Sequence, residues 1–156
     1  MTNYRIPFLS VITPPATEPL TLSEAKLYLR VDSSTEDALI TSLIVTARII
    51  AEQYLQRSLI SQVRKITFND YSFAVISLPF GPVQSVDSIK LIARDGTETS
   101  INSAYYTLTA GNEKVVLDSG LLGNKVEVTY TAGYGEEGDV PENIRQGMLV
   151  HIARSE

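Results

Sequence analysis

A long stretch of helical periodicity lies at residues 34–57. On a helical wheel, one broad arc of this stretch contains Ile40, Leu43, Ile44, Ala47, Ile50, Ala51, Tyr54 and Leu55. Apolar residues at i, i+3, i+4 and i+7 predict a helix with one buried face. We expect Ser34 or Thr35 to cap its start, because a hydroxyl there can accept a hydrogen bond from a backbone N–H of the first turn. A helix of about 20 residues is roughly 30 Å long, so it can organise a small domain.

The opposite side of this wheel carries a second, smaller apolar feature. Val45 and Ile49 lie there one turn apart, beside Arg48 and Glu52. One interpretation is incidental exposure, or cover by another part of the same chain, because single exposed apolar residues are normal. The other is contact with a second copy of the protein. On that interpretation Val45, Arg48, Ile49 and Glu52 form a subunit interface.

Shorter elements surround the long helix. Residues 1–20 hold four prolines, which exclude a regular helix or a central strand and predict an extended arm. The pattern Thr21-Leu22-Ser23-Glu24 is a capping box, and it predicts a short helix that ends near Leu29 or Arg30. From Leu59 the pattern alternates, with strands expected at 59–68, 74–78, 86–93, 97–101, 105–109, 114–117 and 125–130.

Two hairpins and a final helix complete the predicted elements. Asp95-Gly96 and Gly111-Asn112 are typical hairpin turns. An acidic, Gly-containing connection at 131–138 leads to Pro141, which favours a helix start. The apolar side of that helix contains Ile144, Met148, Leu149 and Ile152.

Segregated helices and strands predict the α+β class. The expected chain has an N-terminal helical hairpin with one long helix, a mainly antiparallel β-sheet region and a C-terminal helix. A length of 156 residues predicts a single domain over 1–156. Its parts are an extended arm (1–20), a helical hairpin (21–58), a β region (59–131) and a C-terminal helix (139–156).

Composition narrows the range of functions. Hydrophobic residues make up 44% of the chain, which is ordinary for a globular protein, and the chain has no cysteine. The first residues do not resemble a signal peptide, and no apolar stretch is expected to reach the roughly 20 residues that cross a membrane. The net charge is −5 and the basic residues are scattered. This pattern does not favour tight DNA binding, although DNA could slide past such a surface without adhering.

The sequence offers little for catalysis. His151 is the single histidine, and no carboxylates or cysteines lie at ligand spacing around it. Gly133, Gly135 and Gly138 lack the lysine of a phosphate-binding loop and favour a hinge or turn. The acidic residues Glu136, Glu137, Asp139 and Glu142 lack the spacing of a calcium loop, so a solvated acidic turn is favoured. We therefore predict a non-enzymatic protein with no catalytic, metal-binding or cofactor-binding residues.

Several segments, taken in order, resemble a known family. They are VITPPA at 11–16, EPLTLSEAK at 18–26, LRVD at 29–32, DALI at 37–40, AR at 47–48, AE at 51–52, RSLI at 57–60, LP at 78–79, VQSV at 83–86, TAGYG at 131–135 and VPENIRQ at 140–146. This order is similar to that of the head–tail connector (adaptor) proteins of long-tailed bacteriophages, prophages and gene transfer agents. The resemblance covers nearly the whole chain.

The resemblance implies a structural role in the virion. Connectors of this kind form a ring, usually dodecameric, beneath the portal protein, where the next head-completion or tail protein assembles. DNA would pass through the channel without sequence-specific binding, and assembly would take place in the cytoplasm of a bacterial host. No cofactor and no membrane are expected.

The C-terminal segment of such proteins reaches the portal, so we expect Met148, His151, Ile152 and Arg154 to contact it. Such chains often continue as a longer terminal helix and tail, whereas this sequence stops at Glu156. Two alternatives stay open on the sequence alone. One is a nucleic-acid-binding regulatory protein, because a helical hairpin can enter a groove of DNA. The other is a small hydrolase with a carboxylate pair.

Overall fold

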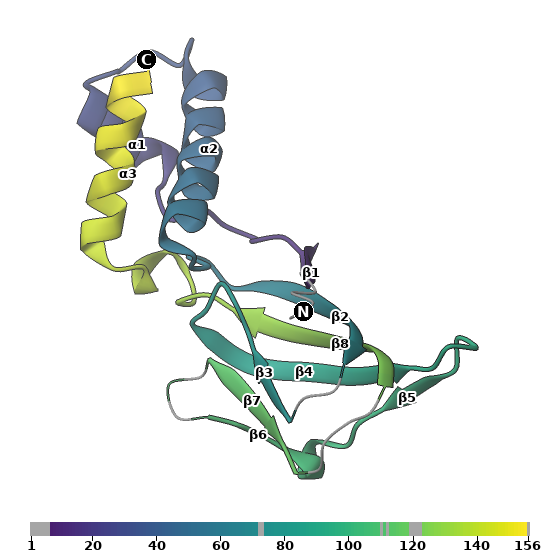
Figure 1. The fold of residues 1–156 in the computed structure, drawn as a ribbon. Coiled ribbons are helices and arrows are strands. Elements are labelled where there is room, and N and C mark those ends of the chain that lie inside the picture. Colours follow the sequence, from purple (N-terminus) through teal and green to yellow (C-terminus); the bar gives the residue numbers. More distant parts are fainter. Residues whose placement is uncertain (1–6, 72–73, 110, 112, 119–122, 156) are drawn as a thin grey trace, which may run out of the picture. The chain divides into compact units, whose positions relative to one another are not determined.

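The computed structural model describes residues 7–71, 74–109, 111, 113–118 and 123–155, and the chain divides into two compact units (Figure 1). The sheet unit contains Met1–Pro14 and Gln62–Gly133, and the helical unit contains Pro15–Ser61 and Tyr134–Glu156. Helices and mainly antiparallel strands are segregated along the chain. The α+β class predicted from the sequence is confirmed.

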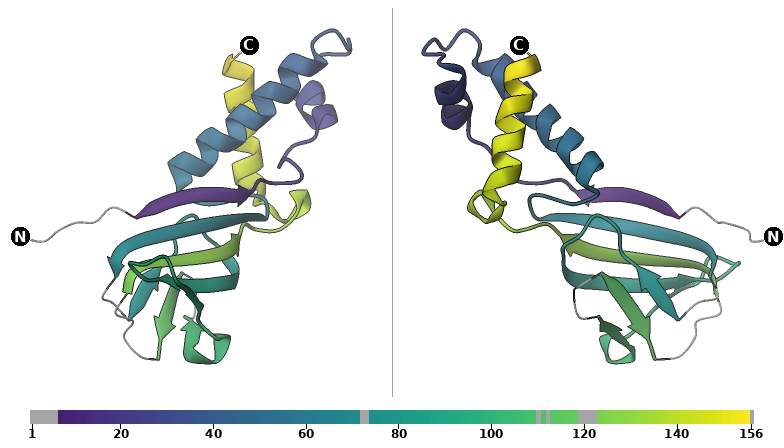
Figure 2. Two further views of the ribbon diagram at one scale, coloured as in Figure 1. Left: turned by 90° about the vertical axis from the view of Figure 1, so that its right-hand side faces the viewer. Right: turned by 60° about the vertical axis from the view of Figure 1, so that its left-hand side comes forward.

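The helical unit is built from two neighbouring helices and a third from the end of the chain. They are α1 (Leu22–Leu29), α2 (Asp37–Leu55) and α3 (Glu142–Ser155), with a short 3-10 turn, η2 (Glu137–Asp139), before α3. The three helices bury an apolar cluster that includes Leu20, Ile40, Ile44, Met148 and Ile152. Figure 2 shows these helices grouped together in both of its views.

The start of α1 is capped as the sequence predicts, whereas the start of α2 is not. The Thr21 hydroxyl accepts from Glu24 N–H at 3.1 Å, and the Glu24 carboxylate accepts from Thr21 N–H at 2.8 Å, so the capping box is confirmed. The prediction that Ser34 or Thr35 caps α2 is wrong. The N-cap residue is Glu36, which makes no side-chain capping bond. The Thr35 hydroxyl is instead hydrogen-bonded to that of Ser33.

The sheet unit contains two antiparallel sheets. The strands are β1 (Phe8–Thr13), β2 (Gln62–Tyr71), β3 (Val75–Ser77), β4 (Val83–Ile92), β5 (Glu98–Ser100), β6 (Tyr106–Leu108), β7 (Lys114–Leu117) and β8 (Gly123–Ala132), with the turn η1 (Ser103–Tyr105) before β6. The larger sheet has the order β1-β2-β8-β4-β5 and the smaller has the order β3-β7-β6. The β4–β5 and β6–β7 hairpins pair as the turn signals predict, although Asn112 lies outside the described residues, as do residues 119–122 of the loop before β8.

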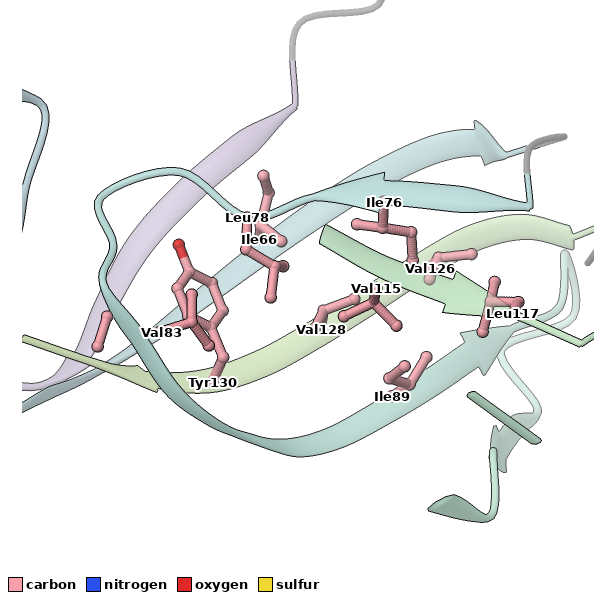
Figure 3. Close-up of a cluster of buried hydrophobic side chains, with 11 residues drawn as sticks. Ile66, Ile76, Leu78, Val83, Ile89, Val115, Leu117, Val126, Val128 and Tyr130 are labelled. Atoms are coloured by element: carbon pink, nitrogen blue, oxygen red, sulfur yellow. The ribbon is translucent and has the colours of Figure 1, made fainter. Parts of the chain in front are cut away.

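The core of the sheet unit lies between its two sheets. Ile66, Val128 and Ile89 stand opposite one another on the three adjacent strands β2, β8 and β4. Figure 3 shows Ile76 and Val115 of the smaller sheet packed in the same cluster. A slip of one residue in any of these strands would turn its apolar residues away from the cluster, so burial fixes the register.

The predicted N-terminal arm is in part a strand. Residues 8–13 form β1, which pairs with β2 at the edge of the larger sheet (Figure 2). Pro7 and Pro14 lie just outside its two ends, where the missing N–H groups of proline do not interrupt the ladder. Residues 1–6 of the predicted arm lie outside the described residues.

The single domain predicted from the chain length stays a prediction. The chain crosses between the two units at 14–15, 61–62 and 133–134, and each unit alone has a smaller core than a domain of the full length. We expect these three crossings to couple the two units in unfolding. In a urea titration followed by NMR, the amide signals of Ile44 and Val128 should give the same midpoint. Two separate midpoints would contradict the single-domain prediction.

Candidate functional site

A large exposed apolar surface of the helical unit lies along α2. Leu39, Ile49, Ile50, Tyr54 and Leu55 are all exposed, with Tyr54 at 87% and Leu39 at 52%. We call Leu39, Ile49, Ile50 and Tyr54 the outer α2 face. Leu39, Ile50 and Tyr54 are separated by 11 and 4 residues, a spacing that places them on one side of the helix. Their apolar stripe therefore faces solvent in the single chain.

The sequence-based assignment of the buried face of α2 is partly wrong. Ile40, Ile44 and Ala47 are buried as expected, whereas Ile50, Tyr54 and Leu55 of the predicted arc are exposed. The reason is that the apolar arc of α2 is wider than the part of it that the rest of the helical unit covers. Periodicity then shows that the helix is apolar but does not say which side the rest of the chain covers.

The predicted interface quartet separates into surface and interior residues. Ile49 is exposed and Val45 is half-buried, whereas Arg48 and Glu52 are only 9% and 5% exposed. Arg48 and Glu52 are therefore not on the surface of the helical unit in the single chain. Both are enclosed within the helical unit, where their charges interact with residues of the same chain.

Arg48 and Glu52 belong to one hydrogen-bonded network. Arg48 Nε donates to Glu18 at 2.6 Å, and a second Arg48 nitrogen donates to Glu52 at 3.1 Å. The other Glu52 oxygen accepts from Leu59 N–H at 2.8 Å. Removing one partner of a buried pair leaves an uncompensated charge, which is strongly destabilising. The network thus connects α2 to the segments that precede α1 and follow α2.

By length and composition α2 could also cross a membrane, with 28% of that stretch buried in the helical unit. The expectation that no apolar stretch approaches this length is therefore wrong for α2. The same features are typical of a helix in the core of a protein or of a protein assembly. Arg48, near the middle of α2, would be costly in a bilayer.

The four predicted portal-contact residues also divide between surface and core. Met148 and Ile152 are 2% and 1% exposed and lie in the apolar cluster of the helical unit. His151 and Arg154 are exposed on α3. Of these four residues, the structure leaves His151 and Arg154 at the surface.

The acidic segment before α3 is arranged around Arg145. Its guanidinium donates to Glu142 at 2.8 Å and to the Pro19 carbonyl at 2.9 Å, pairs with Glu24, and lies 3.9 Å from Glu137. The Asp139 carboxylate accepts from Glu136 N–H at 2.9 Å. Within the described part of the chain, no group of three or more His, Cys, Asp or Glu residues could hold a metal ion. The acidic residues here compensate an arginine and close a turn.

These contacts change the proton affinity of two carboxyl groups. Hydrogen bonding from Thr21 N–H, together with Arg145, lowers the pKa of Glu24 below its ordinary value of 4.5. The Gln146 amide and Arg145 lower the pKa of Glu142 in the same way. The same carboxylates raise the pKa of Arg145, chiefly through its hydrogen bond to Glu24.

Acid should weaken the helical unit. Because folding lowers the pKa of Glu24 and Glu142, the stabilisation is complete above the ordinary value of 4.5 and is lost as the pH falls through the folded-state pKa values. Thermal unfolding followed by circular dichroism between pH 7 and about pH 3 should show a falling midpoint. Glu24→Gln should have a smaller pH dependence than the wild type. An equal dependence in both proteins would show that Glu24 does not contribute.

Comparison with known proteins adds a family assignment. The sequence matches the family described as head completion protein over residues 18–152. Comparison with curated proteins gives no match. Nothing in these comparisons supports the alternative of a nucleic-acid-binding regulator.

The fold is shared with solved structures of gene transfer agent (GTA) particles. A chain in the neck of an empty GTA particle, computed with C6 symmetry, has a TM-score of 0.81 and 23% identity, over 94% of this chain and 82% of that chain. A chain in the virion of a native GTA particle has a TM-score of 0.78 and 22% identity, over 94% of this chain and 82% of that chain. A chain in the neck of a native GTA particle, computed with C12 symmetry, has a TM-score of 0.77 and 22% identity, over 94% of this chain and 81% of that chain.

At such identity the structural likeness establishes the fold alone, whereas the family match extends over most of the chain. The chain therefore belongs to the head completion protein family, which confirms the resemblance to head–tail connector proteins found in its sequence.

Proposed function

We propose that this protein is a structural head–tail connector whose copies assemble into a ring at the head–tail junction of a virion. The outer α2 face is the observation that carries the proposal. Leu39, Ile50 and Tyr54 form an apolar stripe on a helix of 19 residues that its own unit covers on one side only. Such a surface on a small chain is typical of a protein–protein contact.

Family membership and the neck structures support a ring. The GTA necks that share this fold are described with C6 and C12 symmetry, and the sequence resemblance favours twelve subunits. A closed ring requires two different, complementary patches on each subunit. We assign one of them to the outer α2 face, with Val45 at its border, and give Arg48 and Glu52 the role of holding α2 in place from inside.

The other partners follow from the position of such a ring. The exposed end of α3, with His151 and Arg154, is the proposed contact with the portal, and Met148 and Ile152 support it from within the core. The next head-completion or tail protein would bind on the opposite side of the ring. With a net charge of −5, the ring would let DNA pass through its channel without adhesion. The role is structural rather than catalytic, and assembly takes place in the bacterial host cytoplasm.

Substituting Ile50 tests the subunit interface. Ile50→Asp places a charge in the apolar stripe, and it should weaken self-association by about thirtyfold or more, because a buried interface position does not tolerate an unpaired charge. Sedimentation velocity over a concentration series, with and without purified portal protein, would measure this. Val75→Asp in β3 is a matched control, since Val75 is 48% exposed and Ile50 is 43% exposed. Normal assembly of Ile50→Asp, or equal loss in the control, would contradict the assignment.

Substituting the exposed end of α3 tests portal docking. A double variant, His151→Ala with Arg154→Glu, should reduce co-sedimentation with the portal because it reverses a charge within the contact. Arg94→Glu is the control, since Arg94 is an exposed arginine of the sheet unit. These surface changes leave Met148, Leu149 and Ile152 in the core. A truncation before α3 would remove these three residues. Portal binding at the wild-type level by the double variant would refute this docking site.

A further inference from the structure

Helix α1 contributes fewer buried apolar side chains than α2 or α3, and its Leu22 and Leu29 are only partly buried against the apolar cluster. It has eight residues, and Ala25 is its one buried residue. Leu27 is 82% exposed and Tyr28 is 43% exposed. Helices this short are not stable in isolation, so contacts beyond α1 must fix its position.

Polar contacts provide much of that support. Lys26 of α1 pairs with Asp37 at the start of α2 at 2.7 Å. Arg145 of α3 binds both the Pro19 carbonyl and the Glu24 carboxylate, on either side of the α1 start. These contacts anchor α1 from two different helices.

A second arginine holds the segment that leads into α1. Arg48 of α2 binds Glu18 at 2.6 Å, and the side chains of Arg48 and Glu18 are 11% and 25% exposed. Arg48 of α2 and Arg145 of α3 therefore both bind residues within the segment 18–24. Leu20, which is 3% exposed, supplies the apolar anchor between these two contacts.

The contact between α2 and α3 is of a different kind. Ile40, Ile44, Met148 and Ile152 are each at most 3% exposed in one apolar cluster. Releasing residues 18–30 would uncover Leu20 and Ala25 of this cluster, whereas separating α2 from α3 would uncover all four of the larger side chains. Local opening of a protein follows the elements with the fewest buried apolar contacts.

We propose that residues 18–30 form a flap that opens as a unit while α2 and α3 stay packed. The contacts of Arg48 with Glu18 and of Arg145 with Pro19 and Glu24 hold the closed flap against the α2–α3 pair, and we call these contacts the latch. Opening uncovers apolar surface of the helical unit and displaces the exposed Leu27 and Tyr28. The latch thus controls how much apolar surface the helical unit presents to neighbouring proteins. This inference concerns the isolated chain and does not depend on ring formation.

Hydrogen–deuterium exchange of the full-length protein tests the latch. Arg145→Gln removes the contacts to Pro19 and Glu24, and Glu18→Gln weakens the contact to Arg48 but keeps the Arg48–Glu52 pair. Each variant should speed amide exchange in peptides covering 18–30 by about tenfold, since a hydrogen bond to a charged group is lost. Peptides from 40–52 and 144–154 should change by less than about twofold. Arg145→Lys, which keeps the charge, should fall between the wild type and Arg145→Gln.

Lys90→Gln is the matched control, because it removes the exposed Lys90–Glu98 pair of the sheet unit. It should leave exchange in 18–30 unchanged. Unaltered exchange in 18–30 of both latch variants would overturn the proposal. So would an equal acceleration in α2 and α3, because that would show a general loss of stability rather than a flap.

Discussion

The helical unit is organised around α2, which carries more apolar surface than the rest of the unit covers. Ile40, Ile44 and Ala47 are covered by the rest of that unit, but Leu39, Ile50 and Tyr54 on another side of the helix are not. Among the residues that the structure describes, only two further helices, α1 and α3, can cover α2. The exposed stripe follows from that shortage, and an exposed apolar surface of this kind is typical of a protein–protein contact.

Charged residues fix the positions that apolar contacts leave undetermined. An apolar cluster has little directional preference, whereas an arginine requires acceptors at defined positions. Arg48 and Arg145 bind carboxylates and a backbone carbonyl from segments before and within α1. Glu52 does the same for the turn after α2 through Leu59 N–H. These contacts determine where the connecting segments lie against the helices.

The sheet unit relies on a different constraint. Its two sheets share one apolar cluster, and the register of β2, β8 and β4 is fixed because Ile66, Val128 and Ile89 must all point into it. Tyr130 also belongs to this cluster, and its hydroxyl donates to the Pro79 carbonyl at 2.6 Å. Burial of the side chain raises the pKa of Tyr130, so the hydroxyl stays a donor. This hydrogen bond satisfies the polar atom of a side chain that belongs to the apolar core.

Local signals in the sequence were enough to identify most of the secondary-structure elements and the family. Alternation, turn residues and the capping box at Thr21 are local signals, so they identified strands β2 to β8, the hairpins and the start of α1, whereas β1 was expected only as part of an extended arm. The folded structure was needed to show which side of α2 is buried and that Arg48 and Glu52 lie inside. It also placed Met148 and Ile152 in the core and left His151 and Arg154 at the surface. The physical reason is that burial depends on segments distant in sequence: Glu18 and Leu59 reach Arg48 and Glu52 only after the chain has folded back on α2.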